Sequence, residues 1–424
     1  MLLEALRELI NSGDIMIIEK KIILPVFIII YFMSFIIWPA SIRAVVYMMV
    51  LSYTASFFLN KLYNKYNFSS LEKISILVYF FTVIVHSLFF FQDIEQATYG
   101  LYEYFFYPLI FFCALSILPR LNDKIITYIF IVMSIITVAV EQYQSLVQNL
   151  IFLDGTSFGF VSGYSFFRST GLSESPMACG MLTAIYFIYF LFECCETKEK
   201  KWIAMCLLNL YGLYITNSRG PLISLLLALV LAMTLRSCGK SKNKMGSLFK
   251  LFFVLVTMLG LSYIVLVNNF LSDEILARFM SVGDFEENEA NVGRVIYWLM
   301  SINMFTDNMQ NFLFGIGLAR TGALGPAVLF PTESGVLKKL VEGGIILAFV
   351  FYFMVTSMFI RGVKSAWTCK EQKNEKKLCF AITVIIIIFI EEFTLQIMEN
   401  ISVSFFFWSA FALAKYCELM ERSE

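Results

Sequence analysis

The sequence predicts an all-α integral membrane protein with about twelve transmembrane helices. Of its 424 residues, 59% are hydrophobic and 15% are charged, whereas soluble chains carry roughly 25% charged residues. The apolar residues form long continuous runs, which is typical of membrane helices and not of the alternating strands of a membrane barrel. Lys plus Arg equals Asp plus Glu at 32 each, so the chain has no overall basic field for nucleic acid. The composition also excludes a soluble enzyme or a disordered chain.

Each apolar run is close to the roughly 20 residues that a helix needs to cross the hydrocarbon core. The first 21 residues are polar and amphipathic and the first apolar run is long, so we interpret that run as a retained span and not as a cleaved signal peptide. In chain order, the predicted spans are 22–38, 42–59, 74–91, 101–118, 125–140, 177–194, 202–216, 220–236, 250–267, 341–360, 378–396 and 399–415.

The distribution of Lys and Arg predicts the orientation. With the N-terminus inside, 24 of the 32 basic residues fall in inside segments and eight fall outside. This predicts that both termini are cytoplasmic. None of the nine cysteines falls in a long outside loop, which agrees with reduced thiols on the inner side. The expected organisation is a nine-span membrane domain over 1–267, a large outside loop over 268–340, and three further spans within 341–424.

The 268–340 loop is expected to be partly helical. Residues 294–306 have an amphipathic helical pattern, residues 314–318 form a glycine-rich turn, and Thr332 or Ser334 is expected to cap the next helix. Ordered loops of this length are commonly functional. A plain helical hairpin that covers the bundle is the alternative interpretation.

The outside basic residues are six Arg and two Lys, whereas the inside residues are mostly Lys. Arginine binds phosphate or carboxylate with two parallel hydrogen bonds, so this bias indicates a phosphate-bearing or acidic ligand. Arg168 precedes the 177–194 span, Arg219 precedes Gly220-Pro221 at a helix start, and Arg294 is expected to open the outside helix. Helix N-termini favour anions. The alternative is that each arginine pairs with a nearby acid such as Glu174 or Asp307.

Four segments in order resemble the O-antigen polymerase and ligase superfamily of bacterial membrane proteins. They are RSTGLSESPMACG, TNSRGPLISLLLAL, GRVIYWLMSINMFTDNMQNFLFGIGLAR and PTESGVLKKLVEGGIILAF, which together cover roughly residues 165–350. The resemblance implies a glycosyltransferase of the bacterial cytoplasmic (inner) membrane, with its active site facing the periplasm or outside. It also implies a donor glycan on undecaprenyl pyrophosphate.

Two branches of that superfamily differ in acceptor. A polymerase transfers the growing glycan to the next lipid-linked repeat unit and makes O-antigen, capsule or exopolysaccharide, whereas a ligase transfers it to lipid A core. The resemblance implies a histidine in the outside loop of a ligase. This sequence has one histidine, His86, in the 74–91 span, and reads PTESG at the expected position. The polymerase branch is therefore favoured, with membrane lipids and a chain-length regulator and flippase of the same pathway as further partners.

The resemblance also implies roles for individual residues. Arg168, Arg219, Arg294 and Arg320 are expected to bind the pyrophosphate and neutralise its charge. Because the sequence has no Asp-x-Asp motif, we expect no metal and no other cofactor. Glu333 is the first candidate for the general base that activates the acceptor hydroxyl, and Glu174 is the alternative. The simpler interpretation of Glu333 is a carboxylate stabilised by a helix dipole.

Acidic residues inside predicted spans are candidates for a functional role, because charged groups are costly within a membrane. Glu103, Glu391 and Glu392 fall toward the outer ends of their spans, where we expect them to contact sugar hydroxyls or pair with Arg43. A rival from another class is a flippase of the lipid-linked oligosaccharide, in which charged residues would line a path through the bilayer. A polymerase would instead gather its arginines and Glu333 at one outward-facing site. A structural or regulatory membrane protein would leave them scattered.

Overall fold

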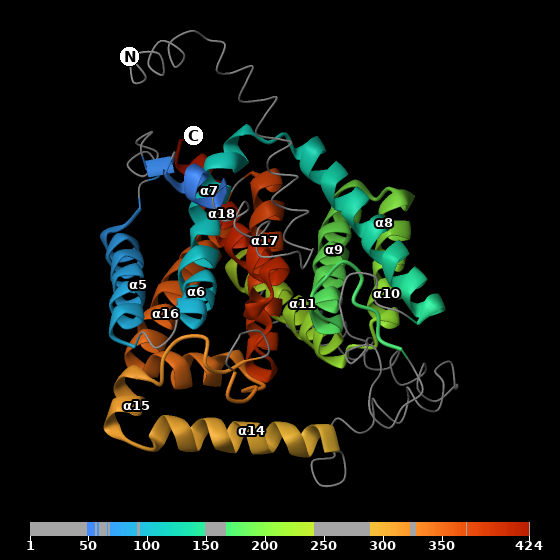
Figure 1. Cartoon of the computed structure of the whole chain (residues 1–424). Coiled ribbons are helices and arrows are strands. Elements are labelled where there is room, and N and C mark those ends of the chain that lie inside the picture. The colour runs from blue at the N-terminus through green and yellow to red at the C-terminus, as the bar shows by residue number, and fades with distance from the viewer. Residues whose placement is uncertain are drawn as a thin grey trace, which may run out of the picture.

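The computed structural model describes residues 49–55, 57–58, 66, 68–90, 94–148, 167–240, 289–322, 328–369 and 371–423. The described residues form helices joined by short connections (Figure 1). The predicted spans 22–38 and 250–267 lie outside these ranges, and 42–59 is described only in part. The helices of the described residues confirm an all-helical membrane architecture for this part of the chain.

The helices follow the order expected from the hydropathy pattern. They are α5 (Ser70–Phe89), α6 (Ile94–Leu101), the π-helical turn η1 (Tyr102–Phe106), α7 (Tyr107–Ile117), the 3-10 turn η2 (Leu118–Arg120), α8 (Asp123–Val147), α9 (Pro176–Thr197), α10 (Lys200–Ile215), α11 (Arg219–Lys240), α14 (Glu289–Thr306), α15 (Met309–Phe314), α16 (Gly335–Thr368), α17 (Gln372–Thr394), the 3-10 turn η5 (Ile397–Glu399) and α18 (Ile401–Ser423).

Six of these helices are long and apolar enough to cross a membrane. They cover Ser70–Phe89, Ile94–Ile117, Asp123–Val147, Pro176–Thr197, Gly335–Thr368 and Ile401–Glu421. The predicted spans 202–216, 220–236 and 378–396 coincide with α10, α11 and α17, which are helical but shorter or more polar over their length. Six candidate spans therefore stand among the described residues.

Local sequence explains where several helices begin. Asn122, Ser175 and Ser334 are the N-caps of α8, α9 and α16, and each side-chain oxygen accepts a hydrogen bond from a backbone N–H of the first turn. The cap at Ser334 confirms one of the two predicted positions. Pro108 is the second residue of α7, which begins where η1 ends. Because proline lacks an N–H and disturbs the preceding helical turn, the irregular turn η1 stands where a kink is expected.

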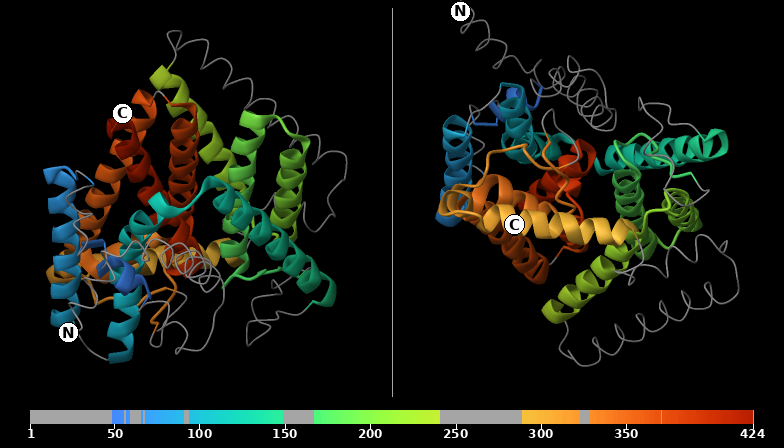
Figure 2. Two further views of the ribbon diagram at one scale, coloured as in Figure 1. Left: turned by 90° about the horizontal axis from the view of Figure 1, so that it is seen from above. Right: turned by 60° about the horizontal axis from the view of Figure 1, so that its bottom comes forward.

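The long helices run between two ends of the molecule, and α14 lies across one of them (Figures 1 and 2). We call this the α14 end; it holds the first residues of α9, α11, α16 and α18. The opposite end holds the first residues of α8 and α17. Both α14 and α15 pack on α16. A partly helical 268–340 region beside the bundle is confirmed for its described residues.

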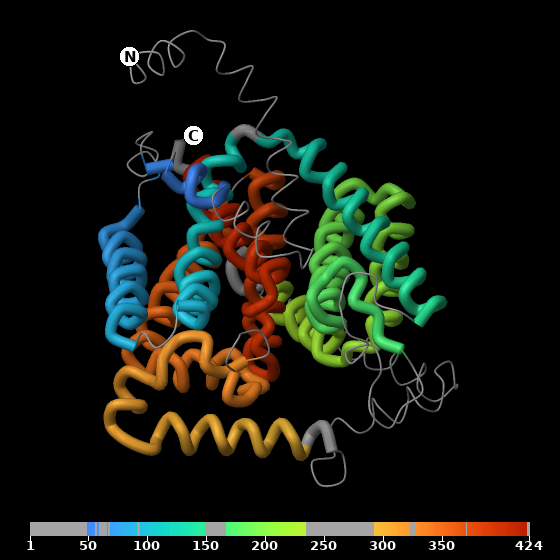
Figure 3. Tube along the Cα trace, in the orientation of Figure 1, coloured from blue at the N-terminus to red at the C-terminus, as the bar shows by residue number. Residues whose placement is uncertain are grey.

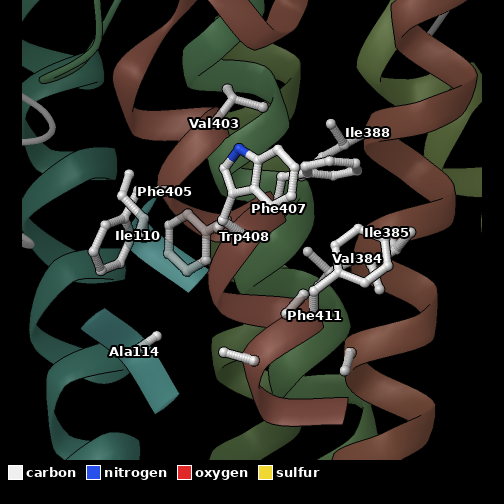
Figure 4. Packing of buried hydrophobic residues seen from close by; sticks show 14 of the residues in the cluster. Ile110, Ala114, Val384, Ile385, Ile388, Val403, Phe405, Phe407, Trp408 and Phe411 are labelled. Atoms are coloured by element: carbon white, nitrogen blue, oxygen red, sulfur yellow. The ribbon is translucent and has the colours of Figure 1, made fainter. Parts of the chain in front are cut away.

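The hydrophobic core lies between α7, α17 and α18. Phe407, Trp408 and Phe411 of α18 are buried and pack edge to face on one another or in tilted contact (Figure 4). On the other side of α17, α8, α9 and α10 pack together as a second group (Figure 3). This group meets the core through the contacts of α9 with α17 and α18 and through α11, which packs on both α9 and α17. Gln96 of α6 is also buried, and its Nε2 donates to Leu318 O at 3.0 Å.

Candidate functional site

Arg294 and Glu333 form an ion pair at the α14 end. The Arg294 Nε lies 3.4 Å from the Glu333 Oε2, and the two side chains are 33% and 24% exposed. The prediction that Arg294 opens its helix is wrong, because α14 begins at Glu289 and Arg294 lies in its second turn. The segment 289–292, Glu-Ala-Asn-Val, continues the helix upstream of the amphipathic pattern.

The position of Glu333 is fixed by its neighbours and not by its own conformational preference. Its φ is +49°, which costs a non-glycine residue on the order of 1 kcal/mol or more. The Trp298 Nε1 of α14 donates to the Glu333 carbonyl at 2.9 Å. On the other side, Ser334 caps α16 and Thr332 Oγ1 donates to the Ser334 carbonyl at 3.1 Å. Glu333 is therefore held between α14 and the start of α16.

Arg219 is the first residue of α11, as predicted. Its neighbour Gly220 packs so closely on Glu391 that a Cβ atom there would overlap the carboxylate. Ser224, one turn later, donates its hydroxyl to the same carboxylate at 2.6 Å. The charge of Arg294 also acts on Glu391. Glu391 thus contacts the start of α11 and lies within electrostatic range of Arg294.

Arg168 lies against the same helix start. Its Nη2 donates to the Ser218 Oγ at 3.1 Å, and Ser218 directly precedes Arg219. The segment that carries Arg168 is fixed by α8, because Gln144 Oε1 accepts from the Thr170 and Gly171 N–H groups at 3.0 and 2.8 Å. Arg168, Arg219 and Arg294 therefore belong to one neighbourhood, linked through Ser218 and Glu391.

Glu174 lies in the same connection as Arg168, two residues before α9, and is partly buried. It shares the polypeptide segment that carries Arg168. Glu333, the other carboxylate predicted as general base, pairs with Arg294, a predicted ligand-binding arginine.

Arg320 belongs to a second group of contacts. It lies in the loop after α15, where the Thr321 N–H and hydroxyl both donate to Glu342 of α16, at 2.8 and 2.9 Å. The Arg320 carbonyl accepts from the Leu329 N–H at 2.9 Å. The contacts of Thr321 with Glu342 thus hold the backbone next to Arg320 against α16. The other three predicted arginines lie near α11 and α14 instead.

A buried ion network underlies this loop. Lys338 is 1% exposed and lies 2.5 Å from both Glu103 and Glu399, and Lys339 lies 2.5 Å from Glu392. The sequence signal for these lysines is their position as a pair in an apolar helix start, but their partners come from distant segments. The expected partner of Glu103 and Glu392, Arg43, lies outside the described residues.

His86 is not one of the residues that contact the arginines or Glu333 in the hydrogen bonds and ion pairs described above. It lies in α5, its Nε2 is 2.6 Å from the Phe314 carbonyl, and its ring stacks on Phe90 at 4.6 Å. The contact agrees with a hydrogen-bonded helix residue that holds the end of α15. Within the described ranges, no three His, Cys, Asp or Glu side chains gather as a set of metal ligands.

The arrangement at the α14 end combines cations with one carboxylate that is only partly buried. Three guanidinium groups near two helix segments suit an anion with several oxygens, and the paired carboxylate of Glu333 suits proton transfer. Binding of a polyanion beside a group that accepts a proton is what a transfer reaction with an anionic leaving group requires.

Comparison with protein families gives a match over part of the chain. Residues 204–352 match the family model described as "O-Antigen ligase". The matched region includes α11, α14, α15 and α16 as far as residue 352. It therefore contains Arg219, Arg294 and Glu333. The chain matches no curated protein. The match over residues 204–352 supports the O-antigen ligase and polymerase superfamily.

Proposed function

We propose that this protein is a polysaccharide polymerase of the bacterial inner membrane. In this role it joins oligosaccharide repeat units carried on undecaprenyl pyrophosphate, at the outer side of the membrane, into O-antigen, capsule or exopolysaccharide chains. The family match over residues 204–352 supports a membrane enzyme that processes glycans. The choice of polymerisation rests on Glu333, which stands where the ligase branch is expected to have histidine.

The proposed reaction is an inverting transfer. The acceptor hydroxyl of the incoming lipid-linked unit gives its proton to Glu333 and attacks the anomeric carbon of the growing chain. The bond from that carbon to the pyrophosphate oxygen breaks, and the electron pair leaves with undecaprenyl pyrophosphate. Arg168, Arg219 and Arg294 bind the leaving group and stabilise the charge that develops on it. Arg320 is a candidate for binding a more distant part of the same ligand.

The observation that carries this proposal is the ion pair between Arg294 and Glu333 beside the start of α11. It brings a phosphate-binding group and a proton acceptor within reach of one reacting centre, as transfer chemistry needs. A flippase would need its charged groups along a path between both ends of the bundle. The grouping at the α14 end therefore supports transfer over transport, with the α14 end facing the outside.

The ligase reaction is the second candidate, because the matching family model carries the ligase description. It would use the same donor and the same arginines, but a lipid A core acceptor. Glu174 remains the alternative base for either reaction, since it lies in the Arg168 connection.

Deletion of the gene, followed by sizing of lipid-linked glycans, tests the proposal. A polymerase mutant is expected to accumulate single repeat units and to have cores capped with one unit. Free long polymer with bare core would identify a ligase instead. Absence of repeat units from the outer side, with accumulation inside, would identify a flippase. The purified full chain should also elongate a chemically defined lipid-linked repeat unit in detergent.

A further inference from the structure

An apolar cavity of about 130 Å³ lies at the opposite end of the molecule, between α8, α9, α17 and α18. Aromatic rings form much of its wall: the Phe130 ring stacks on Tyr189 at 4.1 Å and meets Phe380 and Phe406 edge to face. Ala410 of α18 also lines it. Because this cavity is almost wholly apolar, it suits a hydrocarbon chain better than water.

The mouth of the cavity is charged. Lys373, Lys376 and Lys377, all in the first turns of α17, line it together with Asp123 and Glu193. A second and more polar cavity of about 260 Å³ adjoins the first, and Asp123, Lys373 and Lys377 line both. An apolar chamber therefore opens beneath a layer of charged groups, at helix ends that the Lys and Arg pattern predicts to be cytoplasmic.

The charged groups of this mouth form two ion-paired clusters. On one side, Lys373 and Lys377 share a single carboxylate, since both ammonium groups lie 2.6 Å from an Asp123 oxygen. Glu371 also lines this second cavity and accepts a hydrogen bond from Asn374.

On the other side of the mouth, one ammonium group faces two carboxylates. Lys376 lies 2.9 Å from Glu193 and also pairs with Glu196. One cluster thus offers two cations around the shared carboxylate of Asp123, with Glu371 hydrogen-bonded to Asn374, and the other offers two acids around one cation. Such a mouth complements a head group that carries a negative and a positive charge a few atoms apart.

We propose that this site binds one phospholipid of the surrounding bilayer whose head group carries a phosphate and a primary ammonium group. Its phosphate lies between Lys373 and Lys377, its ammonium group lies by Glu193 and Glu196, and an acyl chain enters the aromatic cavity. Lys373 is 57% exposed, so a phosphate reaches it without displacing protein. The site is distinct from the arginine group at the α14 end and does not depend on the proposed function.

Native mass spectrometry of the full chain tests this proposal. The delipidated protein in detergent is offered an equimolar mixture of phosphatidylethanolamine and phosphatidylglycerol, and bound lipids are counted. We expect one retained phosphatidylethanolamine. Lys373→Ala combined with Lys377→Ala is expected to reduce its retention about tenfold, as for the loss of a charge-assisted contact. Ala410→Phe, which fills the cavity, is expected to reduce retention similarly.

Matched controls separate the site from general effects. Lys200→Ala with Lys201→Ala removes two lysines from the first turn of α10, at the same end of the molecule, and should leave retention unchanged. If Ala410→Phe does not fold, the surface double variant still decides the question. Equal retention in the double variant and wild type would refute the site. Equal retention of phosphatidylglycerol would refute the head-group assignment, and displacement by added undecaprenyl phosphate would identify a carrier lipid as the occupant.

Discussion

At the scale of single residues, Arg294 connects the groups on which the proposed chemistry depends. It pairs with Glu333, and its charge also acts on Glu391, which contacts the start of α11. A guanidinium group presents several N–H donors in a fixed plane, so Arg294 can bind a further anion beside Glu333. We therefore expect substitutions of Arg294 to affect activity more than stability.

Arg294→Ala should lower the rate of chain elongation about 100-fold or more, because an interaction with the leaving group is lost. Arg294→Lys should also be defective, since a point charge lacks the planar fork. The measurement is elongation of a lipid-linked repeat unit by purified protein. Arg361→Lys is the matched control, because Arg361 pairs with Glu72 in another part of the chain. Wild-type activity of Arg294→Lys would argue against bidentate binding.

Glu333→Gln should reduce elongation by roughly 100- to 10,000-fold, as for the loss of a general base. The amide keeps the size of the side chain but cannot accept the proton. Glu333→Asp should retain part of the activity, because the shorter carboxylate can still accept the proton. If Glu174→Gln abolishes elongation and Glu333→Gln does not, then Glu174 is the base.

At the scale of elements, the shape of α16 brings the loop and the bundle together. Gly344 interrupts its helical dihedral angles with a φ of +64°, so a short first part carries Lys338 and Glu342 and a longer second part crosses the bundle. The Ile316 and Gly317 N–H groups donate to the carbonyls of Val341 and Glu342 just before this break. The bend therefore gives the 315–322 loop its place.

Gly344→Ala should destabilise the protein by about 1–3 kcal/mol, because alanine is strained at this φ and its Cβ would overlap the Leu313 backbone. Gly293→Ala in α14 is the matched control, since nothing lies within 4 Å of its Cβ position. That change should be neutral or stabilise by up to about 1 kcal/mol through helix propensity. Thermal unfolding in detergent compares the two. A fully stable Gly344→Ala protein would show that the break is not required.

At the scale of the whole molecule, buried charges join segments that are far apart in the chain. Lys338 of α16 lies between Glu103 of η1 and Glu399 of η5, and Tyr104 donates its hydroxyl to Glu342 at 2.8 Å. These contacts hold three elements together below the loop at the α14 end. Loss of one partner leaves a buried charge without compensation.

Lys338→Met should destabilise the protein strongly, by about 3–5 kcal/mol, because two buried carboxylates lose their shared cation. Adding Glu399→Gln should recover part of that loss. Lys201→Met removes an exposed lysine that pairs with Glu199, and should cost less than about 1 kcal/mol. Thermal unfolding in detergent measures all three. Equal small effects of Lys338→Met and Lys201→Met would contradict a structural role for the network.

The sequence predicts those features that depend on neighbouring residues. Hydropathy locates the helices, a serine before an apolar run predicts the cap of α16, and Gly220-Pro221 predicts the start of α11. It does not predict where α14 begins, because Glu289 to Val292 carry no distinctive pattern. It also does not predict the partners of Lys338 and Lys339, since Glu103, Glu392 and Glu399 reach them only through the tertiary fold. The roles of the arginines and of Glu333 remain predictions.

The π-helical turn at Tyr102–Phe106 sets how α6 is rotated about the helix axis relative to α7. A π turn holds one extra residue, so the helix before it is turned by about 100° relative to the helix after it. With this offset Gln96 points at Leu318 of the loop while α7 presents its apolar face to α18. Deleting one residue from the turn would keep an apolar span of nearly the same length but would rotate Gln96 away from the loop. The π turn therefore fixes the rotation of α6, and with it the contact to the 315–322 loop that carries Arg320, relative to the helical core.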